Sequence, residues 1–422
     1  MNIWLIYPYG SIPGEGKRPD RPSMIADALI AKGHTVTWWA SSFDHVSKTF
    51  RSDDWKDIEV SPNFTIRLVP ALEYRKNISY KRILSEKKYS KEIYSYSKEL
   101  SAPDIVILSE PALFRGKPIM KLVDDKNCLL LLDMLDQWPE LFDIVLPHSL
   151  KFLGKILFRR LYNRRRDYFR KADAVFTVSR SYMDLVESIV PTLSAKYKSV
   201  VYFGTNVSKQ RSEMSQLYNL PAPLKKMSKG KHEVWAIYAS TLGSNYDLKT
   251  LLDAAKLLET KEINIKLLIA GSGPLQDYVV SYIKKNKLKK VIYIGNPSSE
   301  SLAAVYSMCD IGLSMYVKGS TVTMPIKAFH YFAAGLAVVN SLDGDLASLL
   351  VEHNAGIHFE AEDSESLVNA LSVLASERNL RETMAKNSFA LASDFDEKVQ
   401  YKQVSDLVEL VAQRDMRSDT GS

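Results

Sequence analysis

The chain has 422 residues, of which 46% are hydrophobic and 25% charged, and its formal net charge is +7 at pH 7. This length exceeds that of one ordinary domain and predicts two. No apolar run approaches the roughly 18 residues that a membrane span needs. Cys128 and Cys309 are the only cysteines and have no metal-ligand spacing, so the sequence implies neither a disulfide framework nor a zinc site. The first residues lack the features of a signal peptide, and we expect a cytoplasmic protein.

Short apolar runs alternate with helical or polar segments through the first half of the chain. The first run, residues 2–8, precedes a loop rich in glycine and proline and then a helix pattern between Ser23 and Gly33. Later runs with strand character are HTVTWWASS, FTIRLVPAL, DIVILSE, CLLLLDML and AVFTVSR. Strands that alternate with helices predict a parallel sheet covered on both faces.

Residues 151–171 contain nine Lys or Arg and a single acid, Asp167, interleaved with apolar side chains. This pattern is typical of an amphipathic segment that meets anionic lipid headgroups or an acidic ligand. The alternative is a well-solvated surface helix. No nucleic-acid-binding motif accompanies the charge, and we expect no nucleic-acid partner. The candidate membrane-binding residues are Lys151, Lys155, Arg159, Arg160, Arg164 and Arg165.

Residues 206–232 are polar, include prolines and read as a connection between domains. The alternation of strands and helices then restarts. We therefore predict a first domain at 1–205, a linker at 206–232, a second domain at 233–394, and a C-terminal helix at 395–415 that packs back on the first domain. Two doubly wound halves of this kind imply a cleft, with ligands beyond the carboxyl ends of the strands.

Residues 321–340, TVTMPIKAFHYFAAGLAVVN, join a helix start, a glycine stop and an apolar strand. Thr321 or Thr323 can cap the helix, and Pro325 is tolerated in its first turn. Amide groups at a helix start attract phosphate, and Lys327 adds a positive charge one turn in. The helical period places Ile326, Phe329 and Ala333 on an apolar stripe and Lys327 and His330 opposite it. This unit is suited to a diphosphate; the alternative is a helix that only packs on the sheet.

These motifs resemble, in the same order, those of the family 4 retaining glycosyltransferases. The segments that carry the resemblance are YPYGSIPGEGKRPDRPSMIADALIAKGHTV, DMLDQWPE, ADAVFTVS, IYASTLGSNYDLKTLLDAA, LLIAGSGPLQDYV and the 321–340 unit. The resemblance is nearest to the bacterial branch that builds surface polysaccharides on lipid-linked acceptors. It implies an α/β fold of two Rossmann-like doubly wound parallel-sheet domains that face a cleft in the GT-B arrangement. It also implies a hexosyltransferase that needs a nucleotide diphosphate sugar and no metal or other cofactor.

The resemblance places the donor in the second domain. The candidate donor-binding residues are Gly243, Ser244, Gly273, Thr323, Met324, Pro325, Ile326, Lys327 and His330. Typical members carry Glu at the positions of Val322 and His330, the second of which commonly holds the nucleotide ribose, and a basic residue at the position of Ser244. A neutral histidine can still hydrogen-bond a ribose hydroxyl, although His330 as a spacer is an equal alternative. Lys318 and Lys327 are the nearest cations that could replace the missing one.

On the acceptor side the resemblance implicates the loop with Gly10, Gly14, Gly16 and Arg21, where glycines let the backbone approach a ligand closely. Asp136 follows an apolar strand and is the candidate for orienting the acceptor hydroxyl or transferring its proton. Asp133 and Glu140 are the alternatives to Asp136. The GSGP stretch at 271–274 lacks the third glycine of a dinucleotide fingerprint, and we do not expect NAD.

The leading hypothesis is a retaining glycosyltransferase of surface polysaccharide biosynthesis. It would use a UDP- or GDP-linked sugar and a glycan or lipid-linked saccharide, either free in the cytoplasm or peripherally at the inner face of the plasma membrane. The competing hypothesis is a non-catalytic protein of the same fold that binds a glycan or a partner transferase. The departures at His330 and Ser244 motivate this alternative.

Overall fold

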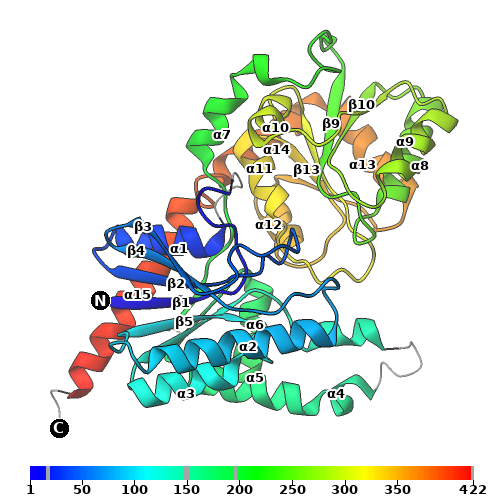
Figure 1. The fold of residues 1–422 in the computed structure, drawn as a ribbon. Coiled ribbons are helices and arrows are strands. Elements are labelled where there is room, and N and C mark those ends of the chain that lie inside the picture. The colour runs from blue at the N-terminus through cyan, green and yellow to red at the C-terminus, as the bar shows by residue number, and fades with distance from the viewer. Residues whose placement is uncertain (16–19, 147–152, 194–196, 420–422) are drawn as a thin grey trace. The chain divides into compact units, whose positions relative to one another are not determined.

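The computed structural model describes residues 1–15, 20–146, 153–193 and 197–419. The chain forms two compact units, one of Met1–Tyr202 with Gln400–Ser422 and one of Phe203–Val399. Each unit is a sheet with helices on its two faces (Figure 1). The α/β class with two Rossmann-like parallel-sheet domains, expected from the sequence, is confirmed.

The first unit is built on an eight-stranded sheet of order β3-β4-β2-β1-β5-β6-β7-β8. All neighbours are parallel except β3 and β4, which pair antiparallel at one edge. The central strands are apolar because both faces of a parallel sheet are covered. The strands are β1 (Asn2–Ile6), β2 (Thr35–Ser41), β3 (Lys56–Ser61), β4 (Phe64–Val69), β5 (Ile105–Glu110), β6 (Leu129–Met134), β7 (Ala174–Thr177) and β8 (Lys198–Val200).

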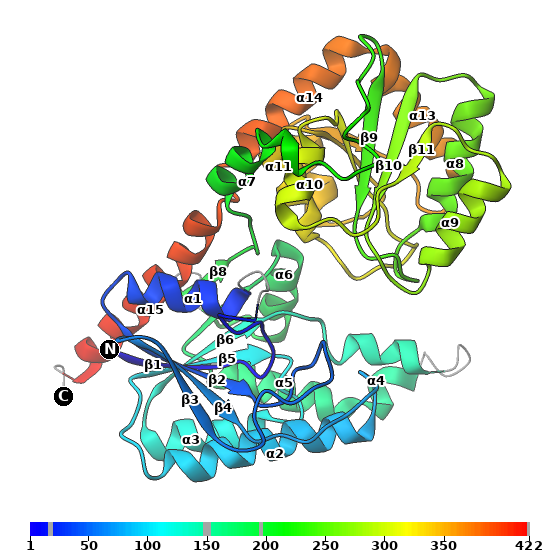
Figure 2. The same cartoon turned by 45° about the horizontal axis from the view of Figure 1, so that its top comes forward.

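Helices of the first unit cover the sheet from both sides, with α1 and α15 on one face and α2, α3 and α5 on the other (Figures 1 and 2). The core between α1, α15 and the strands includes Leu29, Val404 and Val408, each completely buried. The helices are α1 (Arg21–Ile30), α2 (Tyr80–Ser97), α3 (Gly116–Lys126), α4 (Gly154–Leu157), α5 (Arg159–Lys171), α6 (Arg180–Ile189) and α15 (Glu397–Asp419), with a 3₁₀ turn at Glu140–Val145.

The second unit has a six-stranded, entirely parallel sheet of order β11-β10-β9-β12-β13-β14. The order reverses direction at β9 and β12, which is the switch point where doubly wound sheets bind ligands. The strands are β9 (Val234–Ala239), β10 (Ile265–Ala270), β11 (Val291–Tyr293), β12 (Ile311–Ser314), β13 (Ala337–Asn340) and β14 (Gly356–His358).

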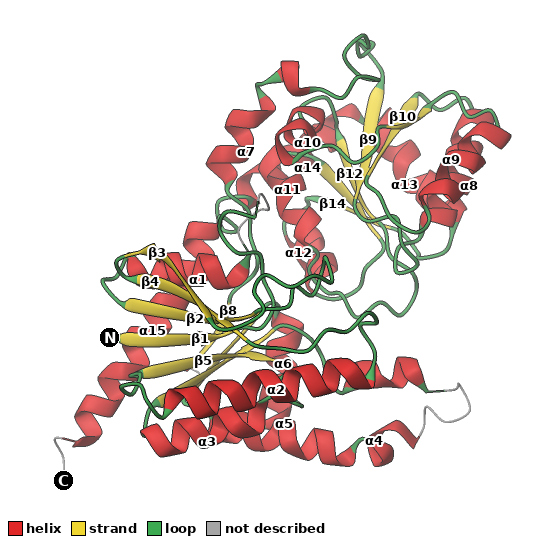
Figure 3. Cartoon of the chain, viewed as in Figure 1, coloured by secondary structure: helices red, strands yellow, loops and turns green. Residues whose placement is uncertain are grey.

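Helices, drawn in red, also cover both faces of the second sheet, whose strands are yellow (Figure 3). Helices α8 and α13 pack together on one face, and α7 packs on α10 and α11 on the other. The helices are α7 (Val207–Met214), α8 (Leu248–Thr260), α9 (Gln276–Lys285), α10 (Ser299–Tyr306), α11 (Ile326–Ala334), α12 (Asp345–Glu352), α13 (Ser364–Ser376) and α14 (Arg378–Leu391), with a 3₁₀ turn at Leu217–Asn219.

Two segments at the predicted domain boundaries can be compared with the observed units. Residues 206–232, for which we expected a linker, begin with α7, which lies inside the second unit and contacts α10 and α11. The C-terminal segment, expected at 395–415, contributes α15, and its residues from Gln400 on belong to the first unit. In the described part of the chain, no helix is both long enough and apolar enough to cross a membrane.

Candidate active site

The carboxyl ends of β9, β10 and β11 form one edge of the second sheet and hold a small cavity of about 190 Å³, lined by polar and apolar groups in similar measure. The loops after β9 and β10 approach so closely here that a Cβ on Gly271 would lie 1.9 Å from the Ser240 carbonyl oxygen, and one on Gly273 2.5 Å from that of Leu242. Only glycine fits these positions. The cavity is lined by Ala239, Ser240, Thr241, Ala270, Gly271, Ser272, Asn296, Pro297 and Leu302.

The start of α11 follows β12 at this same carboxyl edge. The chain enters the helix through Pro325, which has an extended conformation and occupies the N-cap position, and no side chain caps the helix. The expected capping by Thr321 or Thr323 is therefore wrong: the helix begins at Ile326, and the Thr323 carbonyl instead accepts a hydrogen bond from the amide of Leu346. The amide of Ala328, in the first turn, donates to the Pro325 carbonyl at 3.0 Å. The first amides of a helix, here those of Ile326 and Lys327, have no carbonyl of the preceding turn to bond, and they carry the positive end of the helix dipole.

Lys327, in this first turn, is buried with 7% of its surface exposed. Its Nζ lies 4.8, 4.6 and 4.7 Å from the ring centres of Tyr238, Tyr246 and Tyr316. Among the described residues, Nζ has no hydrogen-bond partner. Burial lowers the pKa of Lys327 to about 7, while the three ring faces favour its charged form. A buried amine that lacks an acceptor beside an uncapped helix start is suited to an anion.

The tyrosine cage was not anticipated from the sequence, and the helical period placed Lys327 on the wrong side of α11. Ile326, which the apolar stripe assigned to the core, is 45% exposed, whereas Lys327 points inward. The aromatic residues at 238, 246 and 316 come from β9 and two loops, so only their apolar or aromatic character was visible in the sequence.

His330 lies on α11 against α7. Its Nδ1 is 2.7 Å from Gln210 Oε1 and 3.2 Å from Thr205 Oγ1. The Gln210 amide nitrogen donates to the His330 carbonyl at 2.7 Å, so the amide oxygen faces the ring. This orientation requires a proton on Nδ1, and in the neutral ring Nε2 is then an acceptor. The ring also stacks on Tyr306, with centroids 6.4 Å apart.

The other donor candidates are distributed along the same edge. Gly243 is half-buried and Ser244 is exposed in the loop after β9, whereas Met324 and Pro325 are buried at the start of α11. Lys318 is exposed and pairs with Glu360 at 3.3 Å. Lys327 is therefore better placed than Lys318 to supply the positive charge that the family pattern has at the position of Ser244.

In the first unit, Gly10 and Gly14 have positive φ angles of 144° and 95°. A Cβ on Gly10 would lie 2.8 Å from the Trp38 ring, whereas one on Gly14 would meet nothing within 4 Å. Gly10 is thus required by packing and Gly14 by backbone conformation alone. Gly16, the third glycine proposed for acceptor binding, lies outside the described residues.

Arg21 is 3% exposed and forms a double hydrogen-bonded ion pair with Asp133, which is completely buried. Its Nε and Nη2 lie 2.6 and 2.9 Å from the two carboxylate oxygens, and Nη1 donates to the Val201 carbonyl at 2.9 Å. Tyr7 donates to the same carboxylate at 2.6 Å. These contacts favour a structural role for Arg21 over the acceptor contact that we expected, and they occupy Asp133, one alternative to Asp136.

Asp136 lies just beyond the carboxyl end of β6 and is accessible to solvent. Protein nevertheless surrounds much of its carboxylate, and this desolvation raises its pKa to about 6, against the opposing charge of Arg82. Glu140, the other alternative, is bound by Arg165 at 2.6 and 2.7 Å. Of the three carboxylates, Asp136 is the one that is both accessible and poised to exchange a proton near neutral pH.

The basic segment is only partly available to a membrane. Lys155, Arg159 and Arg160 are exposed, as expected. Arg164 donates to the Leu113 carbonyl at 2.5 Å, and Arg165 is buried against Glu140 and the Trp138 carbonyl. The contacts of Arg165 favour a structural role over lipid binding, because its charge is paired with Glu140 inside the unit. Lys151 lies outside the described residues.

Within residues 1–15, 20–146, 153–193 and 197–419, no group of three or more His, Cys, Asp or Glu side chains could hold a metal ion.

Comparison with known proteins finds similarity to glycosyltransferases in the second unit. Residues 224–390 match the family model described as "Glycosyl transferases group 1". The match lies within the second unit and covers less than half of the chain. The chain is 27% identical over 186 residues to a chitobiosyldiphosphodolichol beta-mannosyltransferase of Candida albicans, a match that covers 39% of this chain and 40% of that protein. It spans between 21% and 54% of the length of the curated relatives it matches.

Solved structures resemble the whole chain at low sequence identity. Sucrose-phosphate synthase from Thermosynechococcus elongatus superposes with a TM-score of 0.69 and 17% identity, over 97% of this chain and 98% of that one. The HepE protein of Anabaena in complex with UDP-glucose superposes with a TM-score of 0.62 and 16% identity, over 98% and 100%. At these identities the likeness establishes the fold, which is that of the GT-B glycosyltransferases.

Proposed function

We propose that this protein is a retaining glycosyltransferase that moves a sugar from a nucleotide diphosphate donor to a hydroxyl of a glycan or lipid-linked saccharide. The observation that carries the proposal is Lys327, a buried amine held by three tyrosine rings at the uncapped start of α11. A diphosphate supplies the anionic oxygens that the amine lacks and that the positive end of the α11 dipole attracts.

The departing diphosphate is the group that needs stabilisation in such a reaction. Lys327 and the α11 dipole act on the negative charge that develops as the bond to the sugar breaks. The 190 Å³ cavity beside Gly271 and Gly273 accepts part of the nucleoside. His330 is the candidate ribose contact, with Nε2 accepting from a ribose hydroxyl in place of the acidic residue of the family pattern.

Asp136 is proposed to act on the acceptor. Its ionised form accepts a hydrogen bond from the attacking hydroxyl, orients it and takes its proton as the new glycosidic bond forms. A pKa of about 6 leaves the carboxylate ionised at neutral pH while keeping it basic enough to receive a proton.

The relatives support a nucleotide-sugar donor. The Anabaena structure contains UDP-glucose, and the Candida albicans relative is named a mannosyltransferase. We extend both to this chain as a choice between UDP- and GDP-linked hexoses. Calorimetric titration with UDP-glucose and GDP-mannose tests the choice directly.

Proton uptake gives the sharper test of the site. Lys327 is largely neutral at pH 8, so binding of a diphosphate diester, which has no titrating group near neutral pH, should recharge the amine and take up about one proton. At pH 6 the uptake should vanish. Titration in buffers of different ionisation enthalpy measures it, with Lys327→Met as the test variant and Lys318→Met as the control. Absence of binding by every nucleotide sugar would sink the enzyme proposal.

We also propose that the protein works on surface polysaccharides of a bacterial cell, in the cytoplasm at the inner face of the plasma membrane. The exposed cations Lys155, Arg159 and Arg160 favour an anionic membrane surface. Flotation with vesicles of neutral and anionic lipid tests this attraction. Equal flotation with both vesicle types, or insensitivity to salt, would count against it.

A second candidate is a non-catalytic protein of this fold that binds a glycan or a partner transferase. The specific observation in its favour is that Gln210 and Thr205 hold the His330 ring against α7, while Ser244 supplies no charge. The two candidates separate in a donor hydrolysis assay. Nucleotide-sugar binding without hydrolysis, and without transfer to any tested acceptor, would support the non-catalytic candidate.

A further inference from the structure

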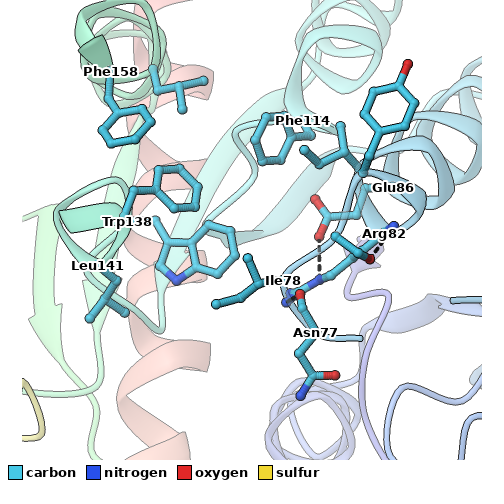
Figure 4. A pocket seen from close by; sticks show the side chains of 13 residues that line it. Asn77, Ile78, Arg82, Glu86, Phe114, Trp138, Leu141 and Phe158 are labelled. Carbon is cyan, nitrogen blue, oxygen red and sulfur yellow. Dashed lines mark hydrogen bonds and ion pairs between the residues drawn. The ribbon is translucent and has the colours of Figure 1, made fainter. Parts of the chain in front are cut away.

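A second cavity, of about 450 Å³, lies in the first unit and is almost entirely apolar. Its size falls within the roughly 300–1,000 Å³ of small-molecule sites. In Figure 4, Trp138, Leu141 and Phe158 stand on one side and Ile78, Arg82 and Phe114 on the other. The remaining lining residues are Asn77, Ser79, Tyr80, Ile83, Glu86, Phe142 and Leu161.

The wall formed by Trp138, Leu141, Phe142, Phe158 and Leu161 is largely aromatic. The Phe142 ring lies 4.8 Å from that of Trp138, 5.3 Å from that of Phe158 and 6.4 Å from that of Phe114. Such a wall offers water few hydrogen bonds, and water in an apolar cavity is readily displaced. The cavity is therefore suited to a hydrocarbon group and not to a sugar ring with its many hydroxyls.

Exposed apolar side chains and positive charge lie close in sequence to residues that line the cavity, and we refer to these flanking residues as its rim. Ile78 is 67% exposed on the α2 side, and Ile156 is 69% exposed on the α4 side. Exposed basic residues flank both: Arg75, Lys76 and Lys81 on the first side, and Lys155, Arg159 and Arg160 on the second. No acidic residue occurs between Arg75 and Ser85 or between Gly154 and Arg166. The charge of this rim is complementary to an anionic headgroup.

A polar end adjoins the apolar walls. Arg82 lies over the Trp138 ring, 5.2 Å from its centre, and its Nε donates to Tyr9 Oη at 3.2 Å and pairs with Glu86 at 3.3 Å. The positive charge of Arg82 acts on Asp136. The proposed acceptor-activating carboxylate and the apolar cavity thus share Arg82 as a neighbour.

We propose that this cavity binds the hydrocarbon chain of an anionic lipid, with its phosphate at the basic rim. The inference rests on the proposed function and deepens it: the acceptor is a lipid-linked saccharide whose chain is held by the protein itself. The hydrocarbon chain enters between the α2 start and the wall of Trp138, Leu141 and Phe158, and its burial supplies the affinity. The rim cations neutralise the phosphate, and the saccharide extends toward Asp136.

Titration calorimetry with n-dodecyl phosphate below its micelle concentration tests the site. We expect butyl phosphate and inorganic phosphate to bind at least about tenfold more weakly, because they bury little or no chain. Ile83→Trp and Leu141→Trp, which fill the cavity from opposite walls, should each weaken dodecyl phosphate by a similar factor, with circular dichroism and thermal unfolding as checks of folding. Unchanged affinity in both folded variants, or equal affinity for butyl phosphate, would overturn the proposal.

The charge of the rim is tested separately. The double variant Lys81→Gln/Arg159→Gln should lose affinity for dodecyl phosphate severalfold and keep its affinity for the uncharged n-dodecyl maltoside. Lys98→Gln/Arg170→Gln is the matched control, because it removes one exposed cation from the far end of α2 and one from the far end of α5. Equal losses of affinity in the two double variants would mean that the net charge of the protein attracts the phosphate, and would contradict a specific role of the rim.

The outcomes separate this inference from the proposed function. UDP-glucose or GDP-mannose binding without binding of dodecyl phosphate would sink the lipid cavity and leave the transferase standing. If dodecyl phosphate binds but no nucleotide sugar does, the transferase proposal fails and the lipid cavity remains supported. Binding of an acidic amphipathic peptide in place of both amphiphiles would overturn the proposal in favour of a protein partner.

Discussion

His330 and Gln210 form a reciprocal pair across α11 and α7. The Gln210 amide nitrogen donates to the His330 carbonyl at 2.7 Å, and the Gln210 amide oxygen lies 2.7 Å from His330 Nδ1. One glutamine therefore sets both the tautomer and the orientation of the histidine that stands where the family pattern has an acidic residue.

The pair predicts coupled losses of stability. His330→Ala and Gln210→Ala should each lower the free energy of unfolding by about 1 kcal/mol, and the double variant should lose less than the sum, because each single change already breaks the shared bonds. Urea denaturation measures all three. Nucleotide-sugar affinity tests the proposed ribose contact of His330. We expect a higher Kd in both single variants, because Gln210 orients the ring. An unchanged Kd would restrict His330 to packing.

Lys327 predicts an unusual pH dependence of stability. Its pKa is about 7 in the folded protein and near its ordinary value of 10.5 in the unfolded chain, so the unfolded chain binds more protons between these limits. The contribution of this residue to stability therefore rises with pH from about 7 to 10.5, and the cost of burying the charged amine is fully present below pH 7. Lys327→Met should stabilise the protein most at pH 6, by at least about 1 kcal/mol, with a smaller gain at high pH.

Thermal or urea unfolding of the wild type and Lys327→Met at pH 6 and pH 9 checks this difference. Lys318→Met, at an exposed position, is the control and should show no comparable pH trend. A gain that is independent of pH would mean that the amine keeps its ordinary pKa in the folded protein.

Asp136 predicts the acid limb of the pH–rate profile. The carboxylate must be ionised to accept a proton, and its pKa is raised to about 6 by desolvation. Transfer should therefore fall about tenfold per pH unit below pH 6. Asp136→Asn should lower the transfer rate by roughly 10²–10⁴-fold and leave donor affinity unchanged. Asp53→Asn, at an exposed position of the same unit, should behave as wild type, and a wild-type rate in Asp136→Asn would remove this residue from the reaction.

Arg21 predicts a stability effect without a specific acceptor effect. Arg21→Ala leaves the Asp133 carboxylate buried without its cation, which should cost about 3–5 kcal/mol of unfolding free energy. Arg21→Met with Asp133→Leu should recover part of this loss, since both charges are then absent. Urea denaturation compares the variants. Full stability of Arg21→Ala together with weakened acceptor binding would return Arg21 to the acceptor site.

The order of helices and strands was predictable because each element follows from a local sequence pattern. Residues 321–340 indicated a helix, a glycine stop and a strand, and the structure has α11, Gly335 in the left-handed conformation and β13 there. Apolar runs such as DIVILSE likewise became buried strands, since a strand covered on both faces requires a continuous apolar run. Two parallel-sheet domains followed from the repeated alternation.

The environment of the site residues depended on contacts between distant segments, which no local pattern contains. Arg21 meets Asp133 across 112 residues, and His330 meets Gln210 across 120. The same holds for Lys327, whose single helical position reads as a solvent-facing charge until Tyr238, Tyr246 and Tyr316 surround it. The sequence by itself determined the fold class and the candidate residues. The tertiary structure alone decided which of their charges are buried, paired or available to a ligand, because desolvation and pairing are properties of the packed neighbours and not of the residue.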